Sequence, residues 1–123
     1  MAQVPMISIV DDDEAVCKAT RTLLRSLGYR VSTFRSAEEF LDSEWLQDTA
    51  CLITDLHMPG MSGLDLQDRL IAGGFRMPII FITAFPGASA REKAEKAGAI
   101  GFMRKPYSDD RLIDCLDRAL KAA

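Results

Sequence analysis

The stretch Cys51-Leu52-Ile53-Thr54-Asp55-Leu56-His57-Met58-Pro59-Gly60 decides the predicted fold. Its first four residues form a short, mostly apolar run, and the Pro59-Gly60 pair marks a turn shortly after it, which is typical of a buried parallel strand. Asp55 stands where that strand ends. Because open α/β sheets place their chemistry at the carboxyl ends of their strands, a carboxylate removed from water at this point indicates a functional role.

Four further strands are predicted around this central one. They are expected at residues 6–10, 30–34, 78–82 and 100–104, the second being more polar and lying at an edge. Stretches with a helical spacing of apolar residues separate them. Such an alternation forms a parallel sheet covered on both faces and joined by right-handed crossovers. The expected class is therefore α/β, a doubly wound five-stranded parallel sheet with five helices.

Helix ends are predicted from capping residues and glycines. Asp13 is expected to cap the first helix, Ser36 and Glu39 to form a capping box on the second, and Ser108 to cap the last. Residues 43–50 are expected to be a frayed helix end and a loop. Glycines are expected to end three helices, at Gly28, Gly73-Gly74 and Gly98.

Apolar stripes are predicted on the faces of two helices. That of the first helix consists of Val16, Ala19, Leu23 and Leu27. That of the fourth helix, at residues 88–97, is a weak stripe of Ala90, Ala94 and Ala97. A helix that buries so little should shift easily.

Length and composition place the chain among ordinary globular proteins. Its 123 residues, 48% apolar and 27% charged, suffice for one domain, expected over residues 6–121 with an N-terminal tail at residues 1–5. The net charge of −3 argues against direct nucleic-acid binding. No apolar run reaches membrane-spanning length and the first five residues lack signal-peptide features, so we expect a cytoplasmic protein with no membrane partner. The three cysteines, expected to be free and mostly buried, are Cys17, Cys51 and Cys115.

Charged residues follow two other predicted strands. Asp11-Asp12-Asp13 comes after the first strand and Lys105 after the fifth, so their side chains should meet Asp55 at one edge of the sheet. Three carboxylates in one place raise each other's pKa, whereas a divalent cation and an ammonium group balance their charge. Mg²⁺ suits such a site because it takes a few carboxylates and keeps waters for an incoming phosphate. Asp55 could then act as a nucleophile that accepts a phosphoryl group.

Each of these residues has a simpler explanation when it is taken alone. The acidic run could cap the first helix, a role we keep for Asp13. Asp55 could start an Asx turn, and Lys105 could be a solvated surface lysine. Their conjunction at three strand ends favours the metal and phosphoryl site.

At this point the residues resemble a known family, the receiver domain of two-component response regulators, over residues 6–120. The resemblance implies a flavodoxin-like fold with strand order 2-1-3-4-5. Two of the matching segments, Met61-Ser62-Gly63 and Ile82-Thr83-Ala84, are similar in sequence to the FixJ-type branch of the family. The matching pieces are Ile9-Val10-Asp11-Asp12, Thr54-Asp55-Leu56-His57-Met58-Pro59, Met61-Ser62-Gly63, Ile82-Thr83-Ala84 and Lys105-Pro106.

The resemblance assigns a role to each residue of the acidic cluster. Asp55 would be the phosphoacceptor, receiving its group from a phosphohistidine on a sensor histidine kinase. Asp12, Asp55 and the backbone carbonyl of His57 would ligate Mg²⁺, or Mn²⁺ in its place, while Asp11 would hold the metal through water. Lys105 would pair with Asp55 at rest and with the phosphoryl oxygens afterwards.

The resemblance also implies a switch. The Thr83 hydroxyl and the Ala84 backbone N–H would bind phosphoryl oxygens, and the ring of Phe102 would fill the space that Thr83 leaves. A plain core role for Phe102 is the alternative. The family usually has a cis peptide bond before the proline that matches Pro106.

Two residues are expected to tune rates. Phe85 is expected to screen the acyl phosphate from attacking water, and His57 either orients water or lies exposed in its loop, the latter being favoured. The chain would not be a conventional enzyme but would assist its own phosphorylation and dephosphorylation.

One surface of the domain is expected to transmit the signal, and three alternative functions are left open. The surface formed by the fourth helix, the fifth strand and the fifth helix is the expected output face and possible homodimer interface, with a solvated charged face as the alternative. Transcription would be regulated through an absent or separate DNA-binding domain. The rivals are a degenerate receiver that works without phosphorylation, an aspartate-nucleophile phosphohydrolase, and a flavin or nucleotide binder. The phosphohydrolase would want a second carboxylate where His57 stands, and the flavin or nucleotide binder a Gly- or Ser/Thr-rich loop in place of the acidic run.

Overall fold

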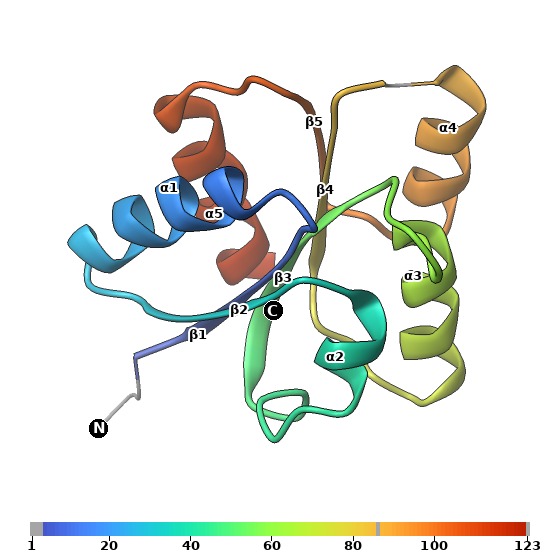
Figure 1. Cartoon of the computed structure of the whole chain (residues 1–123), viewed down its shortest axis with the longest axis horizontal. Helices are drawn as coiled ribbons and strands as arrows, with labels where there is room; N and C mark the ends of the chain where they lie inside the picture. Colours follow the sequence, from blue (N-terminus) through green and yellow to red (C-terminus); the bar gives the residue numbers. More distant parts are fainter. Residues whose placement is uncertain (1–3, 86, 123) are drawn as a thin grey trace.

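Strands and helices alternate along the whole described chain. The computed structural model describes residues 4–85 and 87–122, and within them it contains five strands and five helices (Figure 1). The strands are β1 (Met6–Val10), β2 (Arg30–Phe34), β3 (Thr49–Asp55), β4 (Ile79–Thr83) and β5 (Gly101–Arg104). The helices are α1 (Glu14–Ser26), α2 (Ala37–Leu41), α3 (Gly63–Ala72), α4 (Ala88–Lys96) and α5 (Asp109–Ala122).

The five strands of this described part form one parallel sheet in the order β2-β1-β3-β4-β5. This confirms the predicted class and strand order, and it places β2 at an edge as expected. The direction in which strands are added to the sheet reverses at β1, because β2 lies on one side of it and β3 on the other. The carboxyl ends of β1 and β3 are therefore neighbours, because Val10 pairs with Thr54 in the register of the two strands.

Two apolar layers fill the space on either side of the sheet, because successive side chains of each strand point to opposite faces. Ile80 and Ile82 of β4 pack toward α1 and α5, whereas Ile79 and Phe81 pack toward α2, α3 and α4. Figure 1 shows the same division, with α1 and α5 on one side of the strands and the other three helices opposite.

The predicted caps are largely present. The Asp13 side chain accepts hydrogen bonds from the N–H groups of Ala15 and Val16, and Ser108 accepts one from Arg111. The Ser36 hydroxyl accepts from the Glu39 N–H, but the described residues contain no return bond, so the predicted capping box is only half formed. A complete capping box, which was not predicted, joins Ser62 and Asp65 at the start of α3.

The predicted start of β3 was wrong, because residues 49 and 50 belong to the strand and not to the preceding loop. A chain of hydroxyl groups accounts for the longer strand. Ser8 Oγ lies 2.9 Å from Ser32 Oγ and 2.6 Å from Thr49 Oγ1, and Thr49 donates to the Trp45 carbonyl at 2.7 Å. These bonds satisfy polar groups that β1, β2 and β3 bury together.

The predicted apolar stripe of α1 was only partly right, because Val16 and Leu23 pack at the margin of the core whereas Ala19 and Leu27 do not. The buried residues are Cys17, Thr20 and Leu24, whereas Ala19 and Leu27 are exposed and Val16 and Leu23 are half-buried. On α4 Ala94 is buried and Ala90 half-buried as expected, but Ala97 is exposed. The chain turns at Gly98, and Ala99 takes the packing position that Ala97 was expected to fill.

The beginning of the chain contacts the edge strand. Arg30 donates from its side chain to the Val4 carbonyl at 3.0 Å and from its backbone to the Pro5 carbonyl at 3.2 Å. Residues 1–3 of the predicted tail lie outside the described residues. Nowhere in the described chain is there a helix with the length and apolar character that a membrane crossing requires.

Candidate functional site

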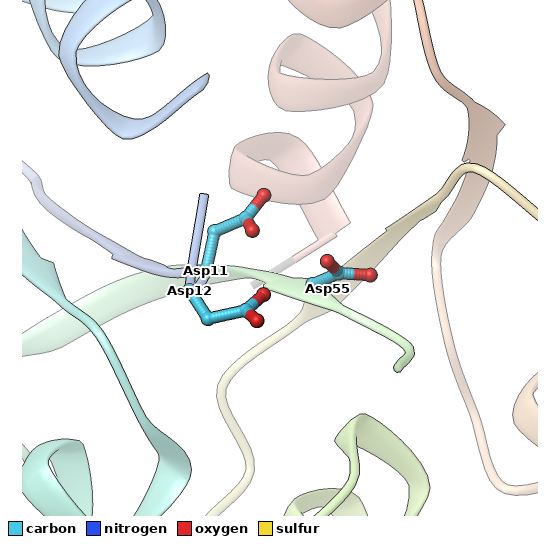
Figure 2. Close-up of side chains that lie close together, drawn as sticks. All are labelled: Asp11, Asp12 and Asp55. Atoms are coloured by element: carbon cyan, nitrogen blue, oxygen red, sulfur yellow. The ribbon is translucent and has the colours of Figure 1, made fainter. Parts of the chain in front are cut away.

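Three carboxylates meet at the carboxyl ends of β1 and β3. Figure 2 shows Asp11 and Asp12 at the end of β1 with their side chains beside that of Asp55 at the end of β3. One carboxylate oxygen from each of the three lies within 4.8 Å of the others. Asp11 and Asp55 are buried, whereas Asp12 is exposed at the mouth of the site. The structure therefore brings together the acidic residues that the sequence predicted.

Lys105 closes the cluster from the end of β5. Its Nζ lies 2.8 Å from Asp11 Oδ2 and 3.0 Å from Asp55 Oδ2, and its side chain is only 15% exposed. The Lys105 N–H donates to the Thr83 carbonyl at 2.8 Å, so the residue is held from its backbone as well. The alternative of a solvated surface lysine is excluded for Lys105.

Burial and charge set the pKa values of this group. Burial raises the pKa of Asp11 to about 6, although the Lys105 ammonium and the Asp13 N–H act in the opposite direction. Burial by itself lowers the pKa of Lys105, but hydrogen bonds and charge from Asp11 and Asp55 outweigh it and the net shift is upward. Two carboxylates thus share one ammonium group, which leaves the metal-free cluster short of positive charge.

The free oxygen atoms of the cluster fit a divalent metal. Asp11 Oδ1 accepts from the Asp13 N–H at 2.9 Å, and Asp55 Oδ1 accepts from the His57 N–H at 3.2 Å. Among the described residues, buried Asp11 Oδ2 has the close ion pair with Lys105 but no hydrogen bond of good geometry. An all-oxygen set with an under-satisfied buried carboxylate is the donor chemistry that Mg²⁺ prefers.

Thr83 ends β4 beside the cluster and is fully buried. Its hydroxyl accepts from the Phe85 N–H at 3.1 Å, so in this state it is engaged by the loop that leads to α4. His57 is exposed, as favoured from the sequence, and its Nε2 lies 3.3 Å from the Phe85 carbonyl oxygen. The Phe85 ring itself is 77% exposed, and its screening role stays a prediction.

Phe102 occupies an intermediate place on β5. Phe102 is half-buried, and its ring centroid lies 6.2 Å from that of Phe81. The Arg91 guanidinium lies 5.9 Å from the centroid of the Phe102 ring. Phe102 also packs against the core layer that contains Phe81, so its switch role and the alternative of a plain core residue both stay predictions. On its other contact, Arg91 of α4 lies over the ring.

Gly63 supports the site from α3, and its importance follows only from the coordinates. A Cβ at this position would overlap the Asp55 carbonyl oxygen and lie 3.0 Å from Leu56 Cα. The Gly63 N–H donates to the Leu56 carbonyl at 2.9 Å. Any larger residue would push α3 away from the end of β3, where Asp55 lies.

Three residues on the α1 side also support the site and were not predicted. The Cys17 thiol, whose pKa burial raises to about 11, donates to the Asp11 carbonyl at 3.3 Å. Thr20 Oγ1 lies 2.6 Å from the Tyr107 hydroxyl, two residues beyond Lys105. The only signals in the sequence for these residues are the helical spacing of Cys17 and Thr20 from Asp13 and the position of Tyr107 after Lys105-Pro106. The Lys105-Pro106 peptide bond is cis, as expected.

A groove of about 540 Å³ opens beside the cluster, between α1 and the turn that follows β5. Lys105 and Ala84 belong to its lining and to the rim of the acidic site. The residues of α1 that were expected to pack inward line its wall, among them Val16, Ala19 and Leu23. The groove therefore presents apolar side chains next to the predicted phosphoacceptor.

Known proteins are similar to this chain in sequence and in fold. The model of the response regulator receiver domain matches residues 7–117. Over 121 residues the chain is 46% identical to the response regulator protein TmoT of Ectopseudomonas mendocina, covering 98% of this chain and 55% of that protein. Over 117 residues it is 34% identical to the transcriptional regulatory protein FixJ of Bradyrhizobium diazoefficiens, covering 95% and 57%.

A solved structure gives the same result. The crystal structure of FixJ-N superposes with a TM-score of 0.87 at 35% identity, covering 99% of this chain and 98% of that one. The predicted similarity to FixJ-type receivers is thus confirmed. The chain spans about half the length of the curated relatives that it matches. With the family model matched over most of its length, the chain belongs to the response regulator receiver domains of two-component signalling systems.

Proposed function

We propose that this domain accepts a phosphoryl group on Asp55 from a phosphohistidine of a sensor histidine kinase, with Mg²⁺ bound by the acidic cluster. One observation carries the proposal. A buried carboxylate at the end of β3 is held by Lys105 and lies within 4.8 Å of two further carboxylates. Structural roles such as capping do not require that arrangement, whereas metal-assisted phosphoryl transfer does.

The transfer step uses the Asp55 carboxylate as nucleophile. One of its oxygens attacks the phosphorus atom of the donor, and the bond between phosphorus and the imidazole nitrogen breaks, its electron pair remaining on that nitrogen. Asp12, Asp55 and the His57 carbonyl would hold the metal directly and Asp11 would hold it through water. When bound there, the metal would neutralise part of the negative charge on the phosphoryl oxygens.

Lys105 supplies the remaining positive charge. Phosphorylation raises the charge on Asp55 from one negative unit to about two and adds acceptor oxygens. The Lys105 ammonium, now shared between Asp11 and Asp55, can move to a phosphoryl oxygen because its backbone stays fixed to Thr83. Hydrolysis by water then breaks the bond between phosphorus and the Asp55 oxygen and restores the carboxylate.

Thr83 would transmit the change. Its hydroxyl would leave the Phe85 N–H and bind a phosphoryl oxygen, beside the N–H of Ala84, which carries only a methyl group. Phe102 would turn inward into the space that Thr83 leaves. The half-buried position of that ring and its loose cover by Arg91 support this step.

The groove between α1 and the β5–α5 turn supports a protein donor. A kinase must bring its phosphohistidine to Asp55, so its surface must rest on the rim of the site. Lys105 and Ala84 lie on both the rim and the groove, and apolar Val16 and Leu23 continue from them along α1. We place the kinase contact there, in the cytoplasm.

The longer relatives of this chain suggest which process the domain controls. FixJ and TdiR of Thauera aromatica are named as transcriptional regulatory proteins, and this chain spans about half of each. We propose that residues 6–121 form a receiver domain that controls a separate DNA-binding domain. The contact would be made through α4, β5 and α5, either with that domain or with a second copy.

Intact mass spectrometry tests the proposal. The protein is incubated with acetyl phosphate and Mg²⁺, and we expect the mass to increase by one phosphoryl group. Asp55→Asn protein and protein treated with a chelator should not gain it. Equal labelling of wild-type and Asp55→Asn protein, or no labelling of either, would contradict the assignment and favour a receiver that works without phosphorylation.

A further inference from the structure

The carboxyl-terminal end of α4 is firmly closed. Gly98 has a positive φ of 105° and donates its N–H to the Glu95 carbonyl at 3.0 Å, and the Ala99 N–H donates to the Ala94 carbonyl at 2.9 Å. This pair of bonds is a Schellman motif, which satisfies carbonyl groups at a helix end. Ala94 itself is fully buried, so this end of α4 is fixed to the layer beneath it.

Gln67 of α3 adds a tie to the same carbonyl. Its Nε2 donates to the Ala94 oxygen at 3.2 Å, and the side chain is buried with only 2% of the residue exposed. Two hollows of about 210 Å³ and 390 Å³ border Gln67, and Ala97 lines both. The buried amide of Gln67 is therefore a direct polar link between α3 and α4, next to two hollows that open to the surface.

The amino-terminal end of α4 is held in a different way. Among the described residues, no side chain caps this end at Gly87, and Ala88 and Ser89 are exposed. The preceding loop is held through Phe85, whose N–H donates to Thr83 Oγ1 and whose carbonyl faces His57 Nε2. The bond to Thr83 is the one that the proposed phosphorylation would remove.

We infer that Gln67 is a positioning residue that fixes the carboxyl-terminal end of α4, so that the helix turns about Ala94 when its amino-terminal end is released. The release rests on the proposed function, whereas the anchor already exists in the resting protein. The nine residues of α4 span roughly 13 Å at 1.5 Å per residue. A turn about Ala94 therefore displaces Ala88 and leaves Lys96 almost in place.

Spin labels on exposed positions measure this motion. Ser89→Cys and Lys96→Cys are each paired with Lys18→Cys on the opposite face of the sheet, since the three native cysteines are buried. Mg²⁺ with beryllium fluoride, which mimics a phosphoryl group on a carboxylate, provides the activated state. We expect the Ser89 distance to change and the Lys96 distance to stay the same, and equal changes at both positions would overturn the pivot.

Two substitutions of similar size test Gln67 itself. Gln67→Met removes the amide but keeps the length of the side chain, and Leu64→Met is the matched control because Leu64 lines the same hollow. In the resting protein, Gln67→Met should raise the hydrogen-exchange rate of the Ala99 amide by roughly 2- to 10-fold, as loss of one net hydrogen bond implies. It should also let Lys96 move on activation, whereas Leu64→Met should behave like wild type.

The outcomes separate the anchor from the proposed function. If Gln67→Met and Leu64→Met exchange alike at Ala99, Gln67 is not an anchor, whatever the phosphorylation result. If beryllium fluoride moves neither label and acetyl phosphate adds no mass, the turning of α4 fails together with the proposed function. The exchange rate of Ala99 in the resting protein then decides the anchor alone.

Discussion

The helices α1 and α4 both follow strands that end at the acidic site, yet they are attached to the protein with very different strength. α1 has 13 residues, is capped by Asp13, and buries Cys17, Thr20 and Leu24. α4 has nine residues, and in the described structure Ala94 is its one buried residue and its first turn has no side-chain cap. The helix beside the predicted metal ligands is held along its length, whereas the helix beside Thr83 is held mainly at its carboxyl-terminal end.

This difference matches the two tasks proposed for this domain. The proposed metal ligands must keep their geometry, and the Cys17 thiol and the Thr20–Tyr107 bond connect α1 directly to Asp11 and to the turn after Lys105. A switch element must change its position for a small change in free energy, which requires few buried contacts. The four predictions below test this division, from the largest expected effect to the smallest.

Leu24→Ala should give the largest effect. Leu24 is fully buried on α1, and removing such a side chain from a core costs about 2–5 kcal/mol of unfolding free energy. Chemical denaturation measures the loss. Leu27→Ala, at a position 47% exposed on the same helix, should change the stability by less than about 0.5 kcal/mol. Similar losses at the two positions would mean that α1 is not held by its inner face.

Asp11→Asn should stabilise the metal-free protein at neutral pH. The pKa of Asp11 is about 6 in the folded state and 3.8 in the reference state, so the folded protein binds the proton more tightly. Wild-type stability therefore falls as pH rises from about 4 to about 6, by up to roughly 3 kcal/mol. The substitution removes this loss above pH 6 and changes little below pH 4.

Denaturation in chelator across this pH range, then with Mg²⁺, checks the prediction. Mg²⁺ should stabilise the wild type and not Asp11→Asn, because binding to the folded state alone raises stability. Asp12→Asn is the matched control, since Asp12 is exposed and its loss should leave the metal-free stability almost unchanged. A pH slope that persists in Asp11→Asn would show that another group causes it.

Gly63→Ala tests how closely α3 must approach the end of β3. The new Cβ would overlap the Asp55 carbonyl oxygen, and backbone atoms cannot give way as a flexible side chain can. We expect a loss of about 1–3 kcal/mol in unfolding free energy and slower phosphorylation by acetyl phosphate. Gly74→Ala is no suitable control because its φ is positive, so Ala72→Ser on the exposed end of α3 serves instead. Unchanged phosphorylation in Gly63→Ala would separate α3 from the site.

Sequence reasoning succeeded where a local signal had a single physical meaning. The acidic residues and Lys105 follow predicted strands, and parallel topology brings strand ends together whatever the packing between. Prediction from the sequence was less complete for the inner face of α1. Val16 and Leu23 pack at the margin of the core as expected, but its centre is occupied by Cys17, Thr20 and Leu24, which have an equally helical spacing.

A polar contact explains why the buried face of α1 differs from the predicted one. Thr20 is buried because Tyr107, 87 positions away in the chain, provides a partner for its hydroxyl, and nothing near Thr20 in the sequence indicates this. Val16 and Leu23 lie beside this buried face and also line the groove next to Lys105. Similarly, residues 49 and 50 join β3 because the hydroxyls of Ser8 and Ser32 continue a chain to Thr49. Contacts between residues far apart in the chain decide which residues are buried and where a strand begins, and a single sequence does not reveal these contacts.

Gly87→Ser should give the smallest effect and bears most directly on the weak attachment of α4. Gly87 has φ −101° and ψ 140°, an extended conformation that any residue adopts, and a Cβ there would meet nothing within 4 Å. A serine at this N-cap position can accept a hydrogen bond from the first turn, and it also restricts the unfolded chain. We expect a gain of about 0.5–1 kcal/mol in unfolding free energy, measured by denaturation.

The gain should also weaken the response to activation if α4 moves as a switch element. A cap that holds its first turn stabilises whichever position of the helix permits the bond, and the extended backbone of Gly87 in the resting state permits it. The apparent affinity for beryllium fluoride with Mg²⁺ should then fall by the same factor, roughly 2- to 5-fold for 0.5–1 kcal/mol. Ala72→Ser, on the exposed end of α3, provides no N-cap and should not change that affinity. A Gly87→Ser protein that is more stable but binds beryllium fluoride as well as wild type would mean that this turn keeps its structure on activation, and the weak attachment of α4 would then serve some purpose other than switching.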